Sequence, residues 1–348
     1  MSESKIGQRK VDHLDLCATD EVAFRGQTNL LECVRLIHQS LPDLDLDSLD
    51  LSVPMMGKTL RAPIVIAGMT GGTERAAKVN KELAALAQER GYAFGLGSQR
   101  AMHRDASCAW TYEVREAAPD VLLFGNLGVV QARDMKTTEI RALVDAVGAD
   151  AICLHMNPAM ELVQPEGDRD FRGGKDTIQR CVQELGVPVI AKETGNGISR
   201  QTAKSLRAAG VEYVDVSGAG GTSWVGVETL RAQGDKRALG ELLWDWGVPT
   251  AAAVAYVAEQ DLKPIATGGM RTGLDVARAL ALGAAAGGIA RGVFQAFETD
   301  GRKGANAFLD RVESELRATM LLVGAQRVED LRSAPRIILG DLKTWLAQ

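Results

Sequence analysis

The sequence predicts a (β/α)8 TIM barrel with an N-terminal extension and C-terminal helices, and three observations support this fold class. Eight short apolar runs follow one another from residue 61, with helical patterns between them. The strands predicted at the last two of these runs are apolar throughout rather than alternating, which suits a parallel sheet covered on both faces. Turns with glycine and arginine follow the last two runs, where such barrels usually hold a phosphate group. Alternation alone also allows a doubly wound open sheet, but the count of eight and the position of these turns favour the barrel.

The first sixty residues do not follow the barrel pattern. We therefore expect domain 1–60 to be an extension and domain 61–348 to be the barrel with its helical tail. Residues 29–40 place apolar side chains at helical spacing, which predicts a helix. Residues 41–52 alternate leucine with acidic side chains, which suits an edge strand or a loop.

The apolar runs themselves predict the eight barrel strands, at 63–69, 93–98, 122–127, 151–156, 188–193, 213–218, 264–269 and 287–292. Helices are predicted between them at 76–90, 137–147, 176–185, 201–209 and 274–282. Gly91 and Gly210 follow two of these helices directly. A glycine at that position commonly ends a helix, because it tolerates the left-handed conformation. The remaining segment, 295–348, has a mixed acidic and basic helical pattern and is expected to pack on the barrel.

The residues that follow the strands predict a ligand pocket, because active sites of such barrels lie at the C-terminal ends of the strands. Each of the first six strand ends carries a hydroxyl, amide, imidazole or ammonium group. In chain order, the residues at the eight ends are Met69 to Gly72, Ser98 to Arg100, Asn126, His155 and Asn157, Lys192 and Glu193, Ser217 and Gly218, Gly268 and Gly269, and Ala290 and Arg291. Together with the segment GGTSW (220–224), they indicate a pocket for a polar ligand that carries a phosphate group.

The turn after the seventh strand is suited to that phosphate. Gly268 and Gly269 let the backbone approach a ligand without a Cβ in the way. Free N–H groups at the start of the following helix would favour an anion. Arg271 and Arg291 can add bidentate contacts to phosphate oxygens. The alternative interpretation is that this glycine-rich stretch is only a tight connection between a strand and a helix.

Lys192 is predicted at the mouth of the fifth strand. A lysine there is either a Schiff-base nucleophile or a fixed positive charge beside an anionic cofactor or substrate. The alternative is an ion pair with Glu193 or Asp215. A bound flavin fits the fixed-charge interpretation, because a cation beside the N1 and O2 side of the ring tunes its electronics. The ring edge would then take hydrogen bonds from Thr70, Ser98 and Asn126.

A second anionic ligand is predicted by a group of donors suited to a diphosphate, namely Arg9, Lys10, Arg100, His155 and Asn157. Arg9 and Lys10 lie in a terminal segment, where a solvated tail is normally the favoured interpretation. Glu161 follows Asn157 closely, and Mg²⁺ often takes one carboxylate together with waters and phosphate oxygens of a substrate. On the sequence alone, an ordinary carboxylate at a helix start is the commoner interpretation of Glu161.

Composition excludes several other classes of function. The net charge of −5 and the lack of a large basic block argue against a nucleic-acid surface. The chain has no apolar run long enough to span a membrane and no N-terminal apolar segment typical of secretion. Its five cysteines are scattered without a CxxC spacing, which predicts reduced thiols in a cytoplasm.

Ten motifs, in order along nearly the whole chain, resemble those of one known family. They are RKVDH (9–13), MTGG (69–72), GSQR (97–100), GNLG (125–128), HMN (155–157), QPEGD (164–168), KETG (192–195), VSGAGGTSW (216–224), DWGVPT (245–250) and GGMRTGLD (268–275). The chain thus resembles the type 2 isopentenyl diphosphate isomerases, the FMN-dependent class. The resemblance implies a cytoplasmic homo-oligomer, a tetramer or an octamer, which converts isopentenyl diphosphate to dimethylallyl diphosphate. It further implies bound FMN, reduced by NADPH, and Mg²⁺, although the reaction is redox-neutral.

The resemblance also implies roles for individual residues. The residues implied to touch FMN are Met69, Thr70, Gly71, Ser98, Asn126, Lys192, Ser217, Thr222, Gly269, Met270, Arg271, Ala290 and Arg291. The residues implied to hold the substrate are Arg9, Lys10, Ser98, Gln99, Arg100, His155 and Asn157, so the extension is expected to contribute to the substrate site. Glu161 would hold Mg²⁺ through the diphosphate. The acid–base catalyst would be reduced FMN, which protonates the terminal alkene carbon before a proton is lost from the neighbouring methylene.

One position departs from the family pattern, H-x-N-x-x-Q-E, because Met160 stands where the pattern has glutamine. An amide can orient or relay a proton, whereas a thioether cannot donate and accepts only weakly. If that amide matters, this chain is slow, relies on the flavin alone, or acts on another prenyl diphosphate or a similar anion.

Two other classes of function stay open on the sequence. A flavin oxidoreductase of the 2-hydroxy-acid oxidase kind shares the barrel and the phosphate site, but it needs a histidine base near the flavin. Of the four histidines, His155 is the one at a strand end, and it belongs to the HMN motif. A catalytically inactive FMN-binding protein is the non-enzyme alternative.

Overall fold

Eight parallel strands close into a barrel in the computed structural model, which describes residues 5–348, with side chains from Gly7 onward. The strands are β4 (Ile64–Ile66), β5 (Ala93–Gly95), β6 (Leu122–Gly128), β7 (Ala151–Met156), β8 (Val189–Glu193), β9 (Tyr213–Asp215), β10 (Lys263–Thr267) and β11 (Ala286–Ile289). Their hydrogen-bonded order is β10-β11-β4-β5-β6-β7-β8-β9, and β9 pairs with β10 to close the ring. Each strand falls on one predicted run. The predicted barrel is confirmed, and the open sheet is excluded.

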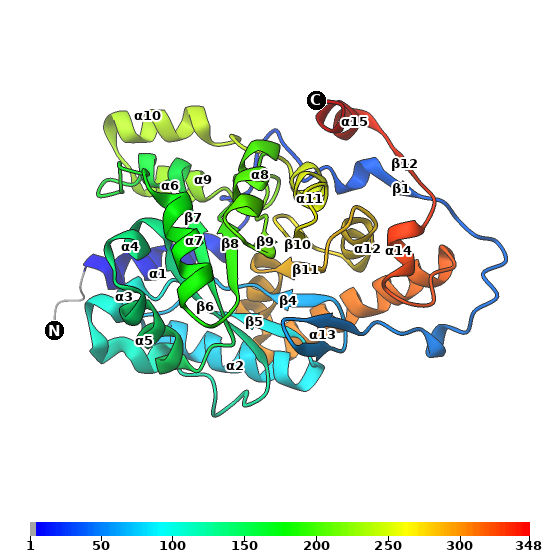
Figure 1. Ribbon diagram of the computed structural model, residues 1–348, viewed down its shortest axis with the longest axis horizontal. Coiled ribbons are helices and arrows are strands. Elements are labelled where there is room, and N and C mark those ends of the chain that lie inside the picture. Colours follow the sequence, from blue (N-terminus) through cyan, green and yellow to red (C-terminus); the bar gives the residue numbers. More distant parts are fainter. Residues whose placement is uncertain (1–4) are drawn as a thin grey trace.

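Helices surround this barrel, as Figure 1 shows. Those that match the predicted helices are α2 (Glu74–Arg90), α5 (Thr137–Val147), α7 (Gly174–Glu184), α8 (Arg200–Ala208) and α12 (Gly273–Ala281). Gly91 ends α2 with a φ of 64°, as expected for a glycine at that position. Further helices are α11 (Thr250–Ala258) between β9 and β10, and the long α13 (Arg291–Leu322), which is interrupted at Asp300 and Gly301.

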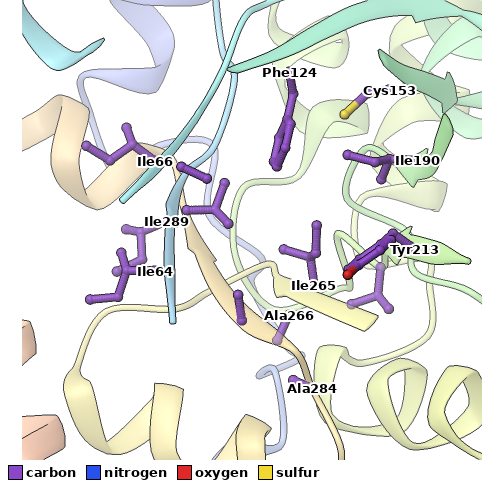
Figure 2. Packing of buried hydrophobic residues seen from close by; sticks show 14 of the residues in the cluster. Ile64, Ile66, Phe124, Cys153, Ile190, Tyr213, Ile265, Ala266, Ala284 and Ile289 are labelled. Atoms are coloured by element: carbon purple, nitrogen blue, oxygen red, sulfur yellow. The ribbon is translucent and has the colours of Figure 1, made fainter. Parts of the chain in front are cut away.

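The barrel interior is filled by apolar side chains from successive strands. Figure 2 shows Phe124, Ile190, Tyr213 and Ile265, which come from four different strands and pack in one region of the core. A short hairpin of β2 (Val53–Met55) and β3 (Lys58–Leu60) precedes β4. The backbone N–H of Met56, in the turn of this hairpin, donates to the Tyr213 hydroxyl. The hairpin therefore covers the end of the barrel at which the strands begin.

Extra helices stand at the opposite end, where the strands finish. They are α3 (Arg100–Arg104), α4 (Val129–Asp134), α6 (Pro158–Val163), α9 (Trp224–Arg231) and α10 (Gly234–Leu243). Ala159 and Val163 of α6 pack with Val225 of α9 in a small apolar cluster that is separate from the main core. This cluster fixes α6 and α9 beside the mouth of the barrel.

The extension begins with α1 (Lys5–Cys17), which lies against α9. His13 Nε2 lies 2.8 Å from a carboxylate oxygen of Glu228, which is completely buried. Arg231 donates to Asp12 and to Glu228 at 2.9 and 2.7 Å. The pairs His13–Glu228 and Asp12–Arg231 join α1 to α9, so the segment that carries Arg9 and Lys10 is not a solvated tail.

The helix predicted over 29–40 is wrong. The structure has a short 3₁₀ turn (Leu31–Cys33) and then β1 (Val34–Leu36), which pairs antiparallel with β12 (Arg336–Ile338) near the C-terminus. The Asn29 side chain accepts from the N–H of Leu31 and donates to the carbonyl of Gly269. The pairing with β12 and this local hydrogen bond outweigh the helical spacing of the apolar side chains in 29–40. Apolar residues at this spacing therefore do not make this segment a helix. Residues 41–52 form the expected loop, apart from one 3₁₀ turn.

The C-terminal segment continues with α14 (Asp330–Ser333) and α15 (Gly340–Leu346). The Tyr256 hydroxyl on α11 donates to the carbonyl of Trp345, and Leu342 is completely buried. Figure 1 shows β12 beside β1, with α15 beyond it, on the side of the molecule away from α1. The tail therefore packs on the barrel as expected.

Candidate active site

Two adjoining hollows lie at the C-terminal ends of the strands. The inner pocket is bounded by strand ends, by α1 and by α6. The second, which we call the glycine cradle, is bounded by the turns at Gly268–Arg271 and Gly288–Gly292. Both hollows are lined by the same seven residues where they meet, namely Thr194, Ser217, Thr222, Trp224, Thr267, Ala290 and Arg291. They therefore form one continuous site with two compartments.

Most of the predicted site residues meet in this site. Those that line the inner pocket are Arg9, Lys10, Met69, Ser98, Arg100, Asn126, His155, Asn157, Glu161 and Lys192. Those that line both compartments are Ser217, Thr222, Ala290 and Arg291, and those that line the cradle alone are Gly269, Met270 and Arg271.

Three predicted residues lie behind the wall of the site instead of lining it. The Gln99 amide is fully buried, donates to the Leu143 carbonyl and accepts from the N–H of Asn126. Thr70 is also buried, and its hydroxyl has no hydrogen-bond partner. Gly71 packs on Tyr112, where a Cβ would lie 2.0 Å from a ring carbon. Gln99 thus supports Asn126, and direct ligand contacts by these three residues stay predictions.

The glycine cradle has the features of a phosphate site. Gly268 has a φ of 115°, and a Cβ there would lie 2.3 Å from the Gly218 carbonyl oxygen. A Cβ on Gly288 would lie 2.0 Å from the Thr267 hydroxyl. In the part of the chain that the structure describes, that hydroxyl and one terminal nitrogen of the buried Arg291 guanidinium have no hydrogen-bond partner. Unpaired buried donors that face a hollow point to a ligand that completes their hydrogen bonds.

The expectation of free N–H groups at the start of α12 is wrong. The N–H groups of Arg271 and Thr272 donate to the Asp275 carboxylate, and that of Gly273 donates to Glu315. At the cradle, the start of α13, which follows Ala290, has no side-chain cap. Its first residues line the cradle, so the helix dipole and N–H groups available to an anion come from α13.

Lys192 forms the ion pair that was considered as an alternative. Its ammonium nitrogen lies 2.8 Å from Asp215, and both side chains are buried. Because Lys192 also lines the inner pocket, the pair holds a positive group at the site instead of removing it. Ser217, two residues after Asp215, has a φ of 33°, which is unfavourable for a residue other than glycine. Such strain often marks a functional position.

The neighbouring Glu193 has a structural role. One of its carboxylate oxygens accepts from the backbone N–H groups of Thr194, Gly195, Asn196 and Gly197. Burial raises the pKa of Glu193 to about 7, and the N–H groups of Asn196, Gly195 and Thr194 act in the opposite direction. The carboxylate shapes the loop after β8, which carries Thr194 into the site.

His155 is held as a neutral ring. Its Nδ1 lies 2.8 Å from the Asn126 side-chain oxygen, whose amide nitrogen donates to the Leu96 carbonyl. That arrangement places the proton on Nδ1 and leaves Nε2 without one. Burial, followed by the charges of Lys192, Lys10 and Arg100, lowers the pKa of His155 to about 3. A bound anion would oppose the effect of those cations.

Arg9 and Lys10 are cations without partners. Neither has a salt bridge or a side-chain hydrogen bond among the side chains that the structure describes. Burial, with a smaller effect from Arg9, lowers the pKa of Lys10 to about 8. Both residues line the inner pocket, as does Arg100, whose contact with Asp168 is loose at 3.8 Å. Buried unpaired cations are costly, so this compartment is suited to an anionic ligand.

Glu161 is fixed in place at the edge of this group. Its two carboxylate oxygens accept from the Asn157 amide and from the backbone N–H of Asp168, at 2.8 and 2.7 Å. Within residues 5–348, no cluster of three histidine, cysteine or acidic side chains suits a metal ion. Glu161 therefore offers a single carboxylate, and a cation here would need ligands from the substrate.

Several lining residues were not predicted as site residues. They are His13, Cys17, Gln131, Gln164, Thr194, Trp224 and Thr267. His13, Gln164 and Thr194 lie inside motifs that the sequence analysis used only for the family resemblance, whereas Trp224 lies in the GGTSW segment that was expected at the pocket. The ring of His13 meets that of Trp224 edge to face, with centroids 5.2 Å apart. An aromatic residue directly after the GGTS segment was the available signal for Trp224.

All five cysteines are free, as expected, among the residues that the structure describes. In the same part of the chain, no helix combines the length and the apolar composition that a membrane crossing requires.

Comparison with known sequences shows close relatives along the whole chain. The family model for FMN-dependent dehydrogenases matches residues 2–161 and 158–337. The isopentenyl-diphosphate delta-isomerase of Methanosarcina barkeri is 43% identical over 99% of this chain and 95% of its own length. The enzymes of the same name from Pyrococcus abyssi and Aeropyrum pernix are 43% and 44% identical, over 98% and 96% of this chain and 94% and 90% of their own lengths.

Solved structures share the fold at low sequence identity. A flavocytochrome b2 with sulfite bound has a TM-score of 0.69 and 19% identity, over 95% of this chain and 84% of that one. A mandelate oxidase variant with an FMN adduct has a TM-score of 0.64 and 18% identity, over 93% and 95% of the two chains. At this identity, the likeness supports the barrel and not a shared reaction.

Proposed function

Because this chain belongs to the isopentenyl-diphosphate delta-isomerases of the FMN-dependent dehydrogenase family, we propose that it converts isopentenyl diphosphate to dimethylallyl diphosphate. The observation that carries the proposal is the presence of two separate anion-binding regions in one site. The glycine cradle suits the phosphate of a flavin, and the unpaired cations on the other side suit the diphosphate of a substrate. A 2-hydroxy-acid oxidase would need only one carboxylate site beside its flavin.

The residues present fit FMN. The unpartnered Thr267 hydroxyl and Arg291 guanidinium would hold its phosphate, together with the backbone at Gly269 and the start of α13. Lys192 and Asn126 line the adjoining inner pocket, where the ring system would lie. When bound and reduced, FMN supplies acid–base chemistry of the kind that moves a double bond. NADPH is proposed as the reductant.

The protein's own residues would bind and orient the diphosphate. Arg9, Lys10 and Arg100 supply positive charge, and the Asn157 amide already points toward Glu161. In this proposal, Glu161 holds a Mg²⁺ ion whose other ligands are water and diphosphate oxygens. His155 enters the reaction neutral, and binding of the anion favours a proton on its Nε2.

The hydrocarbon part of the substrate would face the less polar wall. Met69 and Trp224 line the inner pocket together with Ala67 and Gly68. Such a wall excludes water from an alkene carbon on which positive charge develops. The proposal therefore places charge at one end of the pocket and a dry surface at the other.

The extension has a defined part in this proposal, because α1 brings Arg9 and Lys10 to the inner pocket. We also propose that the protein works in a cytoplasm, which the free cysteines support. A homo-oligomer, tetrameric or octameric, stays part of the proposal on the family resemblance.

The test is an anaerobic assay of the purified protein with FMN, NADPH, Mg²⁺ and isopentenyl diphosphate, in which dimethylallyl diphosphate is measured. Product that depends on both reduction and Mg²⁺ is expected. Protein that binds and reduces FMN but forms no product would contradict the proposal. Lactate-dependent bleaching of the flavin would instead support a hydroxy-acid oxidase.

Met160 motivates a second candidate, an FMN-dependent enzyme that acts on a different prenyl diphosphate. Its thioether lines the inner pocket and lies 3.7 Å from the Asn157 amide nitrogen. Incubation with prenyl diphosphates of increasing chain length separates the candidates. The second one requires a longer chain to react faster than isopentenyl diphosphate.

A further inference from the structure

Gln164 lies at the junction of the inner pocket and a third hollow that opens outward. We call this third hollow the arginine vestibule, because Arg9, Arg100, Arg104 and Arg231 line it, together with Glu166. The inner pocket and the vestibule share three lining residues, which are Arg9, Arg100 and Gln164. The junction thus consists of two cations and one amide.

Within residues 7–348, the side-chain oxygen of Gln164 has no hydrogen-bond partner. The residue is 4% exposed, and this oxygen, Oε1, is buried. The other amides that line the inner pocket are engaged. Asn126 bonds to Leu96 and His155, Asn157 donates to Glu161, and Gln131 donates to Asp168. A buried amide without a partner is unfavourable, and its position at the junction indicates that a ligand completes it.

The charge at the junction identifies the ligand's chemistry. Arg9 has an unpartnered Nε, and no carboxylate pairs with its guanidinium among the described residues. Arg100 and Arg104 follow each other by four residues on α3, so two like charges share one face of that helix. An anion at the junction would relieve this repulsion. The orphaned atom, Oε1, is an acceptor, but the oxygen and nitrogen of an amide exchange places when the group turns over. After that turn, the N–H₂ group takes the position of Oε1 and can donate to such an anion.

We propose that Gln164 binds the anionic headgroup of the substrate and donates an amide hydrogen bond to a diphosphate oxygen. The inference rests on the proposed function for the identity of the headgroup. Gln164 is four residues after Met160, at the end of the same short helix. Because the thioether of Met160 cannot donate, Gln164 is the free amide that this turn of chain offers to the ligand.

The experiment measures binding of inorganic pyrophosphate to the FMN-loaded, oxidised protein, so that no turnover is needed. Gln164→Met keeps the length of the side chain and removes the amide. Its dissociation constant for pyrophosphate should rise roughly 10- to 100-fold, the effect of losing a hydrogen bond to a charged group. Gln164→Glu should bind still more weakly, because it places a negative charge beside an anion. A purely packing role predicts no such difference between the two variants.

Gln88→Met is the matched control, because the Gln88 amide accepts from the N–H of Asp120 outside all three hollows. It should leave pyrophosphate affinity unchanged, and all variants should retain FMN with an unaltered absorbance spectrum. If the wild-type protein and Gln164→Met bind pyrophosphate equally tightly, the inference about Gln164 is overturned while the proposed function stands. Failure of the wild-type protein to bind pyrophosphate at all would overturn both the inference and the proposed function.

Discussion

Met160 is the residue whose chemistry most directly sets the activity expected of this site. It faces Asn157 in the inner pocket and supplies no donor there. Met160→Gln should raise the turnover number at least about tenfold, because an amide can orient or relay a proton and such groups contribute strongly to acid–base catalysis. Steady-state kinetics with reduced FMN measure the change. A variant with equal or lower turnover would show that the thioether is not a defect.

Lys10 makes ligand binding depend on pH. Burial, and then the charge of Arg9, lowers its pKa to about 8, so the free protein loses this cation as the pH rises through about 8. The protonated form attracts the anion, so affinity should be full below about pH 7. It should fall above pH 8 by up to about tenfold per unit.

Titrations of diphosphate binding between pH 7 and pH 9 test this dependence. Lys10→Arg keeps its charge over the whole range and should give a flatter profile, while ionisation of the ligand itself affects both proteins equally. Identical profiles for the two proteins would mean that Lys10 stays protonated or does not meet the ligand.

Individual site residues could be predicted from the sequence where the barrel geometry fixes the position of their side chains. Lys192, His155 and Asn126 were predictable because the ends of parallel barrel strands must converge. Gln164 was missed because it lies at the end of an inserted helix, whose direction over the barrel mouth has no local pattern. The burial of Lys10 was also out of reach, since a charged residue near a terminus has the composition of a solvated tail.

Among the elements, α1 decides whether the substrate half of the site exists. It is joined to α9 through the buried Glu228, which meets His13 and Arg231. Burial alone would raise the pKa of Glu228, but His13 and Arg231 outweigh burial and lower it. The carboxylate is therefore ionised at neutral pH. Glu228→Gln should lower the free energy of unfolding by roughly 1–3 kcal/mol and weaken pyrophosphate binding while FMN stays bound.

Denaturant unfolding and binding titrations check this expectation. Asp15→Asn is the control on the same helix, because it removes a pair with Arg75 in which the Asp15 side chain is 61% exposed. Surface pairs of this kind contribute at most about 1 kcal/mol. If both substitutions had equal effects on binding, the buried network would not be what positions α1.

Element prediction failed where distant segments compete with local pattern. Part of the segment at 29–40 forms β1 because it pairs with β12. That partner lies about 300 residues away along the chain, so the local sequence pattern gives no sign of the pairing. The start of α12 looked open to an anion, but Asp275 and Glu315 already accept its N–H groups. An acidic residue at the third helical position signals such a cap, and Asp275 could have been read that way.

At the scale of the whole molecule, the C-terminal tail packs on the outside of the barrel and lines none of the three hollows. Leu342→Ala on α15 should lower the free energy of unfolding by roughly 2–4 kcal/mol, because its side chain is completely buried against the barrel's outer helices. Affinities for FMN and pyrophosphate should stay unchanged at 25 °C. Loss of either affinity in the folded variant would mean that the tail also shapes the pocket.

The barrel was the part of the structure that the sequence predicted best, because of how its strands are buried. A strand buried on both faces is mostly apolar, so β4 and β11, which are apolar at every position, stand out from an amphipathic background. Eight such strands with helices between them leave few ways to cover both faces of a sheet.

The unpaired cations around Arg9 and Lys10 have a consequence for the medium in which the protein works. The chain as a whole carries a charge of −5, so dissolved anions are repelled on average and concentrate where positive charge is uncompensated. Inorganic phosphate or sulfate would gather there as counter-ions and compete with the substrate. An affinity measured in phosphate buffer is then a competition between two solutes, and the strength of this site is a property of the solution as much as of the fold.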